Sequence, residues 1–230
     1  MKHSDTDVII AGGGLAGATL ALALAKVAPA LRVTVAEVFP LSADALPNAY
    51  QPSYDARSTA LAWGSRLIFE ELGLWQRISE HATPIQQIHV SDRGRFGATR
   101  LNAKEYEQQA LGYVVDNRWM GLCLVRELLE TNVQWQAPAE VTGMTPSEQG
   151  VSVTLKAGDA TSTLTAQCLI VADGGRSGLR EKLGFQPSHR NYDQNALIAN
   201  VSTSDSHQFA AFERFTDAGP MAMLPHGSPS

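Results

Sequence analysis

Short, uninterrupted apolar runs recur along the chain and predict buried strands. Two of them, Val8–Ala11 and Val33–Ala36, lie near the start, and such runs are typical of parallel strands that are covered on both faces. Residues 15–28, between these runs, are apolar on nearly all sides, which predicts a buried helix. The first 37 residues therefore predict one βαβ unit.

The same segment has the length and polarity of a membrane span or a signal sequence. Residues 8–28 are almost uncharged, and about 20 apolar residues cross a bilayer. However, Asp5 and Asp7 precede the segment and three consecutive glycines, 12–14, interrupt it. Because such glycines break a membrane helix but suit a sharp turn, the pattern favours a strand, a turn and a helix.

Helical and strand patterns alternate in the middle of the chain. A helix is predicted from about Ser58 to Leu72 and is terminated by Gly73. Its apolar stripe consists of Leu61, Gly64, Ile68 and Leu72. Another helix is predicted over residues 118–130. Strands are predicted over residues 88–90, 113–115 and 133–136.

Strand patterns dominate the rest of the chain, from Val151 onward. Apolar and polar residues alternate from Val151 to Leu155 and are followed by a turn at Gly158-Asp159, which predicts a hairpin. Cys168–Val171 is another uninterrupted apolar strand, followed by Asp173, Gly174 and a short helix from about Ser177. Short apolar stretches over residues 196–224 predict strands of a second sheet.

Composition narrows the function classes. The 230 residues are 44% hydrophobic and 18% charged, with a net charge of −5 and no long basic run, which argues against nucleic-acid binding. Two cysteines, Cys123 and Cys168, exclude a disulfide framework and read as small buried side chains in a cytoplasmic protein. The six histidines show no paired ligand spacing, so no metal site is predicted.

A glycine-rich turn follows the first strand. Gly12, Gly14 and Gly17 have the spacing G-x-G-x-x-G between a predicted strand and a predicted helix. The first glycine permits the tight turn, the second lets a pyrophosphate approach the backbone, and the third lets the helix pack on the strand. The candidate cofactor-binding residues of this turn are Gly12, Gly13, Gly14, Ala16 and Gly17.

Glu37 completes the dinucleotide-binding pattern. It ends the second strand, twenty positions after Gly17, where a carboxylate accepts hydrogen bonds from both hydroxyls of an adenosine ribose. The alternative is that the glycines only close a tight turn and that Glu37 is a solvated strand end. NAD and FAD have the same ADP half, so this turn does not decide between them.

Asp173 and Gly174 follow a strand end, where open α/β sheets place their ligands. This segment resembles the Asp-Gly motif of the flavoprotein aromatic hydroxylases, the class A FAD monooxygenases typified by para-hydroxybenzoate hydroxylase. Asp55-Ala56-Arg57 resembles the family segment that carries an arginine near the flavin. Residues 90–94, 212–215 and 219–225 resemble the ubiquinone-biosynthesis hydroxylases within the family.

The resemblance implies an α/β fold with a Rossmann-like FAD-binding domain and a partial, mainly β substrate domain. Residues 1–75 and 106–185 are expected to form the FAD-binding domain, and residues 76–105 and 186–230 the substrate domain. Arg57, Asp173 and Gly174 then join Glu37 and the glycine turn as cofactor-binding residues. No protein nucleophile is required, so no catalytic residue is assigned.

The implied activity is hydroxylation of a polyprenyl phenol ring in ubiquinone biosynthesis, with FAD as cofactor and NAD(P)H and O₂ as co-substrates. The implied partners are this phenol, other ubiquinone-biosynthesis proteins and, peripherally, the inner membrane. The family's third motif, a later Gly-Asp strand end, does not occur in the sequence, because the one Gly-Asp pair lies in the predicted hairpin turn. The chain is therefore expected to be the N-terminal part of a longer enzyme and inactive by itself. Two alternatives stay open: an NAD-dependent dehydrogenase, and a non-catalytic, incomplete nucleotide-binding fragment.

Overall fold

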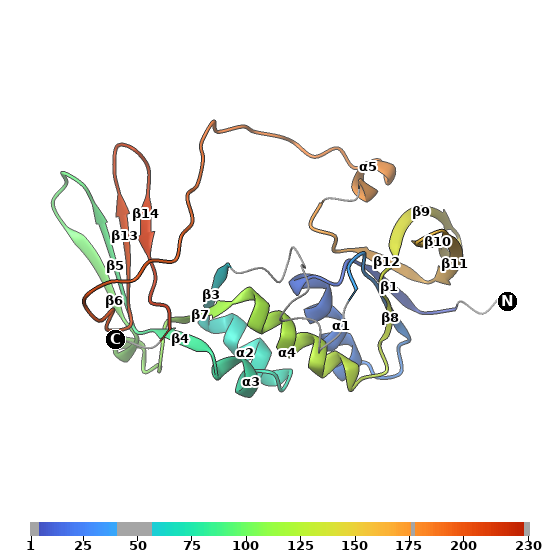
Figure 1. Ribbon diagram of the computed structural model, residues 1–230, viewed down its shortest axis with the longest axis horizontal. Helices are drawn as coiled ribbons and strands as arrows, with labels where there is room; N and C mark the ends of the chain where they lie inside the picture. The colour runs from blue at the N-terminus through green and yellow to red at the C-terminus, as the bar shows by residue number, and fades with distance from the viewer. Residues whose placement is uncertain (1–4, 41–56, 176–177, 228–230) are drawn as a thin grey trace. The chain divides into compact units, whose positions relative to one another are not determined.

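The computed structural model describes residues 5–40, 57–175 and 178–227, and the chain divides into two compact units (Figure 1). Unit 1 comprises residues 1–57 and 117–189, and unit 2 comprises residues 58–116 and 190–230. The chain thus passes from unit 1 to unit 2, returns to unit 1 and enters unit 2 again. The limits of these units differ from the predicted domain limits, and the roles of the domains stay predictions.

A parallel sheet forms the centre of unit 1. Its strands are β1 (Val8–Ala11), β2 (Val33–Ala36), β8 (Gln134–Gln136) and β12 (Cys168–Val171), in the order β12-β1-β2-β8. All pairs are parallel. Strands β1, β2 and β12 coincide with the three apolar runs, and β8 lies within the strand predicted over residues 133–136. This confirms the predicted βαβ unit.

Two helices, α1 (Leu15–Val27) and α4 (Asn117–Leu129), pack against each other in unit 1 (Figure 1). Ile10 faces α1, because a Cβ atom on Gly17 of that helix would lie 3.3 Å from the Ile10 side chain. Lys26 of α1 and Glu127 of α4 form an ion pair with an Nζ–Oε1 distance of 2.8 Å. Helix α1 therefore packs on one face of the sheet, and the ion pair between Lys26 and Glu127 joins α1 to α4.

The opposite face of the parallel sheet is covered by a second, antiparallel sheet. Its strands are β9 (Glu140–Ser147), β10 (Gly150–Ala157) and β11 (Ala160–Ala166), in the order β11-β10-β9. Ile9 and Ala11 of β1 lie in one buried cluster with Val153 and Leu155 of β10. Since side chains alternate along a strand, Ile9 and Ile10 supply the two faces. The predicted hairpin is confirmed as β10 and β11.

The described residues of unit 2 form two sheets, two α-helices and one short 3-10 helix. One sheet has the order β3-β7-β4, and the other β14-β13-β5-β6. The first consists of β3 (Ser58–Ala62), β7 (Gly112–Asp116) and β4 (Ala82–Ile85), with α2 (Trp63–Glu71) and α3 (Trp75–Ser79) between β3 and β4 in the chain. The second consists of β5 (Gln87–Asp92), β6 (Ala98–Asn102), β13 (Ala210–Phe215) and β14 (Met221–Met223), and a short helix η1 (Ala103–Tyr106) follows β6.

The helix predicted over residues 58–72 is wrong in its first turn. Residues 58–62 form β3, which pairs antiparallel with β7, and α2 begins only at Trp63. The predicted stripe is buried only in part, because Leu61 and Leu72 are buried but Ile68 is exposed. Phe69, which lies outside the stripe, is buried. Gly73 follows the helix with a φ of +71°, as predicted for a terminating glycine.

Two further expectations differ from the structure. Cys123 is buried, but Cys168 is exposed, so only one cysteine is a core side chain. The strands predicted over residues 196–224 begin only at Ala210, and residues 185–209 lie outside helices and strands. The short helix expected from Ser177 is α5 (Leu179–Lys182). Ser177, Asp55 and Ala56 lie outside the described residues.

Candidate functional site

Three parallel strands of unit 1 end at the same level. Ala11 of β1 pairs with Val171 of β12 on one side and with Ala36 of β2 on the other. Gly12, Asp173 and Glu37 follow these strand ends within one or two residues. The topology therefore brings the glycine turn, the Asp-Gly turn and the predicted ribose-binding carboxylate to one edge of the sheet, as the carboxyl ends of parallel strands require.

The glycine turn and the Asp-Gly turn are in direct contact. Gly12 has a φ of +105°, and a Cβ atom at this position would lie 2.5 Å from the Ala172 carbonyl oxygen and 2.9 Å from Cα of Asp173. The Ala172 amide donates to the Ala11 carbonyl at 2.8 Å. Only glycine fits at position 12, because any side chain would collide with the backbone of the neighbouring corner.

The start of α1 is built to receive an anion. Gly14 is the N-cap residue and offers no side-chain acceptor to the first-turn amides, and the first turn contains no acidic residue. Gly17 lets the helix start close to the turn, since a Cβ atom there would lie 1.9 Å from the Gly12 carbonyl oxygen. The N-terminal amides and the helix dipole favour a negatively charged group such as a diphosphate.

Glu37 is buried and holds the glycine turn. Its Oε2 atom accepts the Gly13 amide at 2.6 Å, and its Oε1 atom accepts the Phe39 amide at 2.9 Å. The side chain is not the solvated strand end of the alternative interpretation, because the residue is only 6% exposed. A carboxylate has about four lone-pair sites, so it can also accept from the hydroxyls of a ribose.

Asp173 shapes its own turn. Its Oδ1 atom accepts the Gly175 amide at 2.8 Å, the geometry of an Asx turn. Gly174 follows with a φ of +68° and is exposed. The turn thus presents exposed backbone beside the glycine turn, where a bound dinucleotide would lie.

The two remaining candidate residues are Ala16 and Arg57. Ala16 is exposed in the first turn of α1. The carbonyl of Arg57 accepts the Asn117 amide at 2.9 Å, which fixes the backbone of Arg57 at the start of α4. The cofactor contacts of these two residues, and of the whole candidate set, stay predictions. The residues that the structure brings together are Gly12, Gly13, Gly14, Gly17, Glu37, Asp173 and Gly174.

The ADP half of FAD fits this arrangement. A diphosphate has the open amide end of α1, and an adenosine ribose has the Glu37 carboxylate beside Gly13. The glycines at positions 12 and 17 keep side chains away from the turn that would receive the diphosphate. These residues would hold the nucleotide, and they supply no acid, base or nucleophile.

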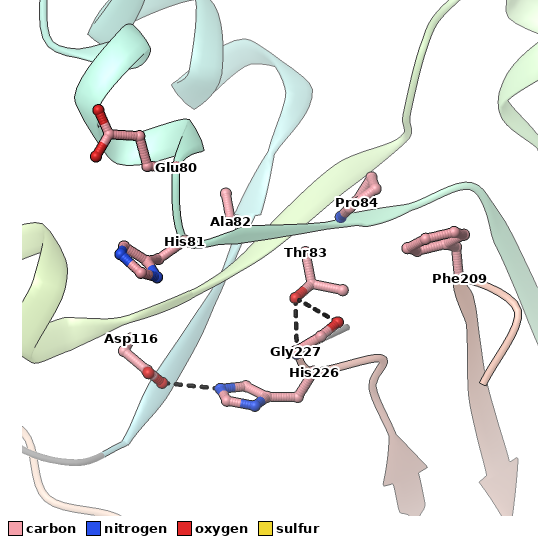
Figure 2. Close-up of a pocket in the computed structure, with 9 residues that line it drawn as sticks. All are labelled: Glu80, His81, Ala82, Thr83, Pro84, Asp116, Phe209, His226 and Gly227. Carbon is pink, nitrogen blue, oxygen red and sulfur yellow. Dashed lines mark hydrogen bonds and ion pairs between the residues drawn. The ribbon is translucent and has the colours of Figure 1, made fainter. Parts of the chain in front are cut away.

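Sequence reasoning missed a pocket in unit 2, shown in Figure 2. The cavity has a volume of about 460 Å³. It is lined by residues of β4 and β7 and of the segments before β4, before β13 and after β14: Glu80, His81, Ala82, Thr83, Pro84, Asp116, Phe209, His226 and Gly227. Nε2 of His226 lies 2.9 Å from Oδ1 of Asp116. These two residues are 110 positions apart, so no sequence spacing signals the pair.

Hydrogen bonds set the charge state of Asp116. Its partial burial would raise the pKa, but the hydrogen bonds from Ser58 and His226 together hold the pKa below the usual value of an aspartate. The Ser58 hydroxyl donates to Oδ1 at 2.6 Å. Asp116 is therefore a carboxylate near neutral pH.

Within the described ranges, no helix is long and apolar enough to cross a membrane. The same part of the chain contains no group of three or more His, Cys, Asp or Glu residues that could hold a metal ion.

Relatives of known function match nearly the whole chain. Ubiquinone hydroxylase UbiL of Rhodospirillum rubrum is 35% identical over 221 residues, which cover 95% of this chain and 49% of UbiL. The 3-demethoxyubiquinol 3-hydroxylase of Escherichia coli is 26% identical, over 98% of this chain and 56% of that enzyme. The chain spans about half the length of the curated relatives it matches.

Solved structures share the fold. The flavin-dependent monooxygenase PieE, in complex with FAD and substrate, matches with a TM-score of 0.62 and 23% identity, over 79% of this chain and 33% of PieE. A geranylgeranyl bacteriochlorophyll reductase-like protein of Thermoplasma acidophilum matches with a TM-score of 0.69 and 16% identity, over 97% of this chain and 54% of that protein. The predicted α/β fold, with a Rossmann-like unit and a mainly β unit, is confirmed.

A protein-family model matches nearly the whole chain. The model described as "FAD binding domain" matches residues 5–228, which include both turns and the second unit. Together with the hydroxylase relatives, this match confirms the resemblance to the FAD-dependent hydroxylases. The chain therefore belongs to the FAD-binding domain family.

Proposed function

We propose that this chain binds FAD at the edge of the β12-β1-β2 sheet and forms the FAD-binding part of a flavoprotein monooxygenase. The observation that carries the proposal is the contact of two corners: Gly12 lies against Ala172 and Asp173, while Glu37 holds the Gly13 amide. An NAD-dependent dehydrogenase also uses a glycine turn, but its fold does not account for the family match over residues 5–228.

The roles of the protein residues follow from their geometry. The amides at the start of α1 bind the diphosphate, Glu37 accepts the ribose hydroxyls, and the Asp173 turn lies beside the diphosphate. Bound FAD would supply the redox chemistry between NAD(P)H, O₂ and the substrate. The protein contributes binding and orientation, and unit 2 would exclude water from the substrate.

The proposed substrate is a polyprenyl phenol of ubiquinone biosynthesis. UbiL of R. rubrum and the E. coli 3-demethoxyubiquinol 3-hydroxylase support this, because both are named as ubiquinone-pathway hydroxylases. The sequence favours 2-polyprenyl-6-methoxyphenol hydroxylase within this group. Contact with the inner membrane and with other proteins of the pathway belongs to the same proposal.

The isolated chain is proposed to lack turnover, since the family's third motif is not among its residues. Full-length UbiL serves as a positive control for NAD(P)H oxidation. Flavin bound to the isolated chain without NAD(P)H oxidation would support this proposal, and substrate-dependent oxidation by the isolated chain would overturn it.

Titration of the purified chain with FAD, followed by flavin fluorescence and by absorbance near 450 nm, tests the cofactor site. We expect Gly14→Val and Glu37→Arg to lose FAD, because the first fills the diphosphate site and the second replaces the ribose acceptor with a cation. Glu130→Arg, an exposed residue of unit 1, is the matched charge control and should retain FAD. Stoichiometric flavin in both site variants, or preferential binding of NAD by the wild type, would contradict the proposal.

A further inference from the structure

The unit 2 pocket joins an apolar end to a polar end. Figure 2 shows Phe209 and Pro84 at one end, and Asp116 and His226 at the other. The cavity volume of about 460 Å³ lies within the range of small-molecule sites, and its lining combines apolar residues with the polar side chains of Thr83, Asp116 and His226. A ligand that fits has a ring against Phe209 and Pro84 and a polar substituent near His226.

The segment that carries His226 is fixed in place. The Gly227 amide donates to the Thr83 hydroxyl at 2.8 Å, and a ring nitrogen of His207 lies 3.3 Å from the Gly227 carbonyl oxygen. Together with the contact between His226 and Asp116, these bonds hold the residues after β14 on β4 and β7 (Figure 2). The imidazole is therefore held on the pocket wall by both neighbouring strands.

The Asp116 carboxylate selects one tautomer of His226. A carboxylate only accepts hydrogen bonds, so Nε2 of His226, 2.9 Å from Oδ1, must carry the proton. Neutral imidazole has one N–H group, which leaves Nδ1 as an acceptor. In the part of the chain that the structure describes, Nδ1 of His226 has no hydrogen-bond partner. The other titratable groups of the pocket wall are Glu80 and His81.

We propose that this pocket binds an aromatic ring bearing a hydroxyl group, which donates its hydrogen bond to Nδ1 of His226. Asp116 acts as a positioning residue, since it holds the imidazole in the accepting tautomer and itself accepts from Ser58. The inference deepens the proposed function and rests on it, because a phenol is the proposed substrate class. A ring without the hydroxyl hydrogen fits the apolar end equally but leaves Nδ1 without a donor.

Phenol and anisole are the matched probes, because they differ by one methyl group that removes the hydrogen-bond donor. Binding to the purified 230-residue chain is measured by NMR titration at pH 8. One neutral hydrogen bond corresponds to a preference for phenol of about three- to ten-fold. His226→Leu is expected to bring the ratio of the two dissociation constants to about one, whereas His189→Leu, at an exposed site in unit 1, should leave it unchanged.

The tautomer gives a second readout that does not depend on the folding of a variant. The ¹⁵N chemical shifts of His226 in the wild type should identify the form protonated at Nε2, and Asp116→Asn should increase the other form and lower the preference for phenol. Equal affinities for the two probes in the wild type, retention of the preference in folded His226→Leu, or protonation at Nδ1 in the wild type would each overturn the proposal. None of these measurements uses FAD, so failure of the proposed cofactor site gives a different pattern: phenol selectivity without flavin binding.

Discussion

The two corners of unit 1 stand side by side but are shaped by different forces. At the first corner, backbone atoms approach so closely that Gly12 and Gly17 have no room for a Cβ atom. At the second corner, Gly174 has no atom within 4 Å of a Cβ atom, and the turn is shaped by the hydrogen bond from the Gly175 amide to Asp173. One corner is thus defined by steric contact and the other by a single polar side chain.

This difference bears on how each corner would meet a ligand. A corner fixed by close backbone contact keeps its amides oriented whether or not a ligand is present, which reduces the ordering cost of binding. The second corner shares this close contact at Ala172, but the turn that follows, over residues 173–175, is shaped by an exposed hydrogen bond and is easier to rearrange. We therefore expect the glycine turn to behave as a preformed diphosphate site and the Asp173 turn as an adaptable neighbour.

The largest expected effect comes from adding a methyl group at each corner. Gly17→Ala places Cβ against the Gly12 carbonyl oxygen and should lower the free energy of unfolding of unit 1 by about 3 kcal/mol. Gly174→Ala meets no atom and bears only the strain of a positive φ, about 1 kcal/mol. Urea denaturation followed by circular dichroism measures both. Equal losses would show that the two corners do not differ in packing.

A smaller effect is expected at Asp173. Asp173→Ala removes the acceptor of the Gly175 amide and should lower the free energy of unfolding by about 0.5 kcal/mol. Asp173→Asn keeps an oxygen at the same position, so its stability should match that of the wild type. Hydrogen exchange of the Gly175 amide reports the same bond locally: it should accelerate in the alanine variant and not in the asparagine variant. Unchanged exchange in both variants would contradict the role assigned to this side chain.

The smallest effect concerns the opposite end of the same strands. Hydrogen bonds from Arg32 lower the pKa of Asp7, and those from Thr165 lower the pKa of Asp5. A carboxylate whose pKa is lower in the folded state stabilises the fold above its unfolded pKa, about 4, and this stabilisation disappears as the pH falls through the folded value.

The test of this effect is the pH dependence of unfolding. Asp7→Asn should flatten the loss of stability between neutral pH and pH 3, measured by urea denaturation at a series of pH values. Glu130→Gln, at an exposed position, serves as the control and should retain the slope of the wild type. A wild-type slope in Asp7→Asn would show that the contact between Asp7 and Arg32 contributes no net stability.

Local patterns were sufficient to predict the parallel sheet and the glycine turn. The apolar runs at Val8 and Val33 are typical of buried parallel strands, and the spacing of Gly12, Gly14 and Gly17 has a direct steric meaning. Glu37 was placed correctly at the strand end, but its hydrogen bond to Gly13 joins residues 24 apart and was not predicted. The sequence therefore specified the parts of this site, and only the fold supplied the contacts between them.

Long-range pairing explains what the sequence did not predict. Residues 58–62 have a helical apolar spacing, but pairing with β7 makes them a strand, because Gly112 allows the backbone of Leu61 to approach closely. The pair of Asp116 and His226 depends on two strand ends that are remote in sequence. Cys168 lies in an apolar run, but its strand pairs with β1 as the outer strand of the parallel sheet, and the side chain is exposed.

The parallel pairing of β5 with β13 has a consequence for biosynthesis. Gln87 at the start of β5 pairs with Ala210, so this ladder forms only after most of the chain has been translated. Until then, the hydrogen-bonding edge of β5 that β13 will cover is open on the nascent chain, and unpaired edges invite association with other strands. Closing this long loop also costs chain entropy and slows folding, so the edge of β5 should stay open for longer than the edge of a hairpin strand such as β10.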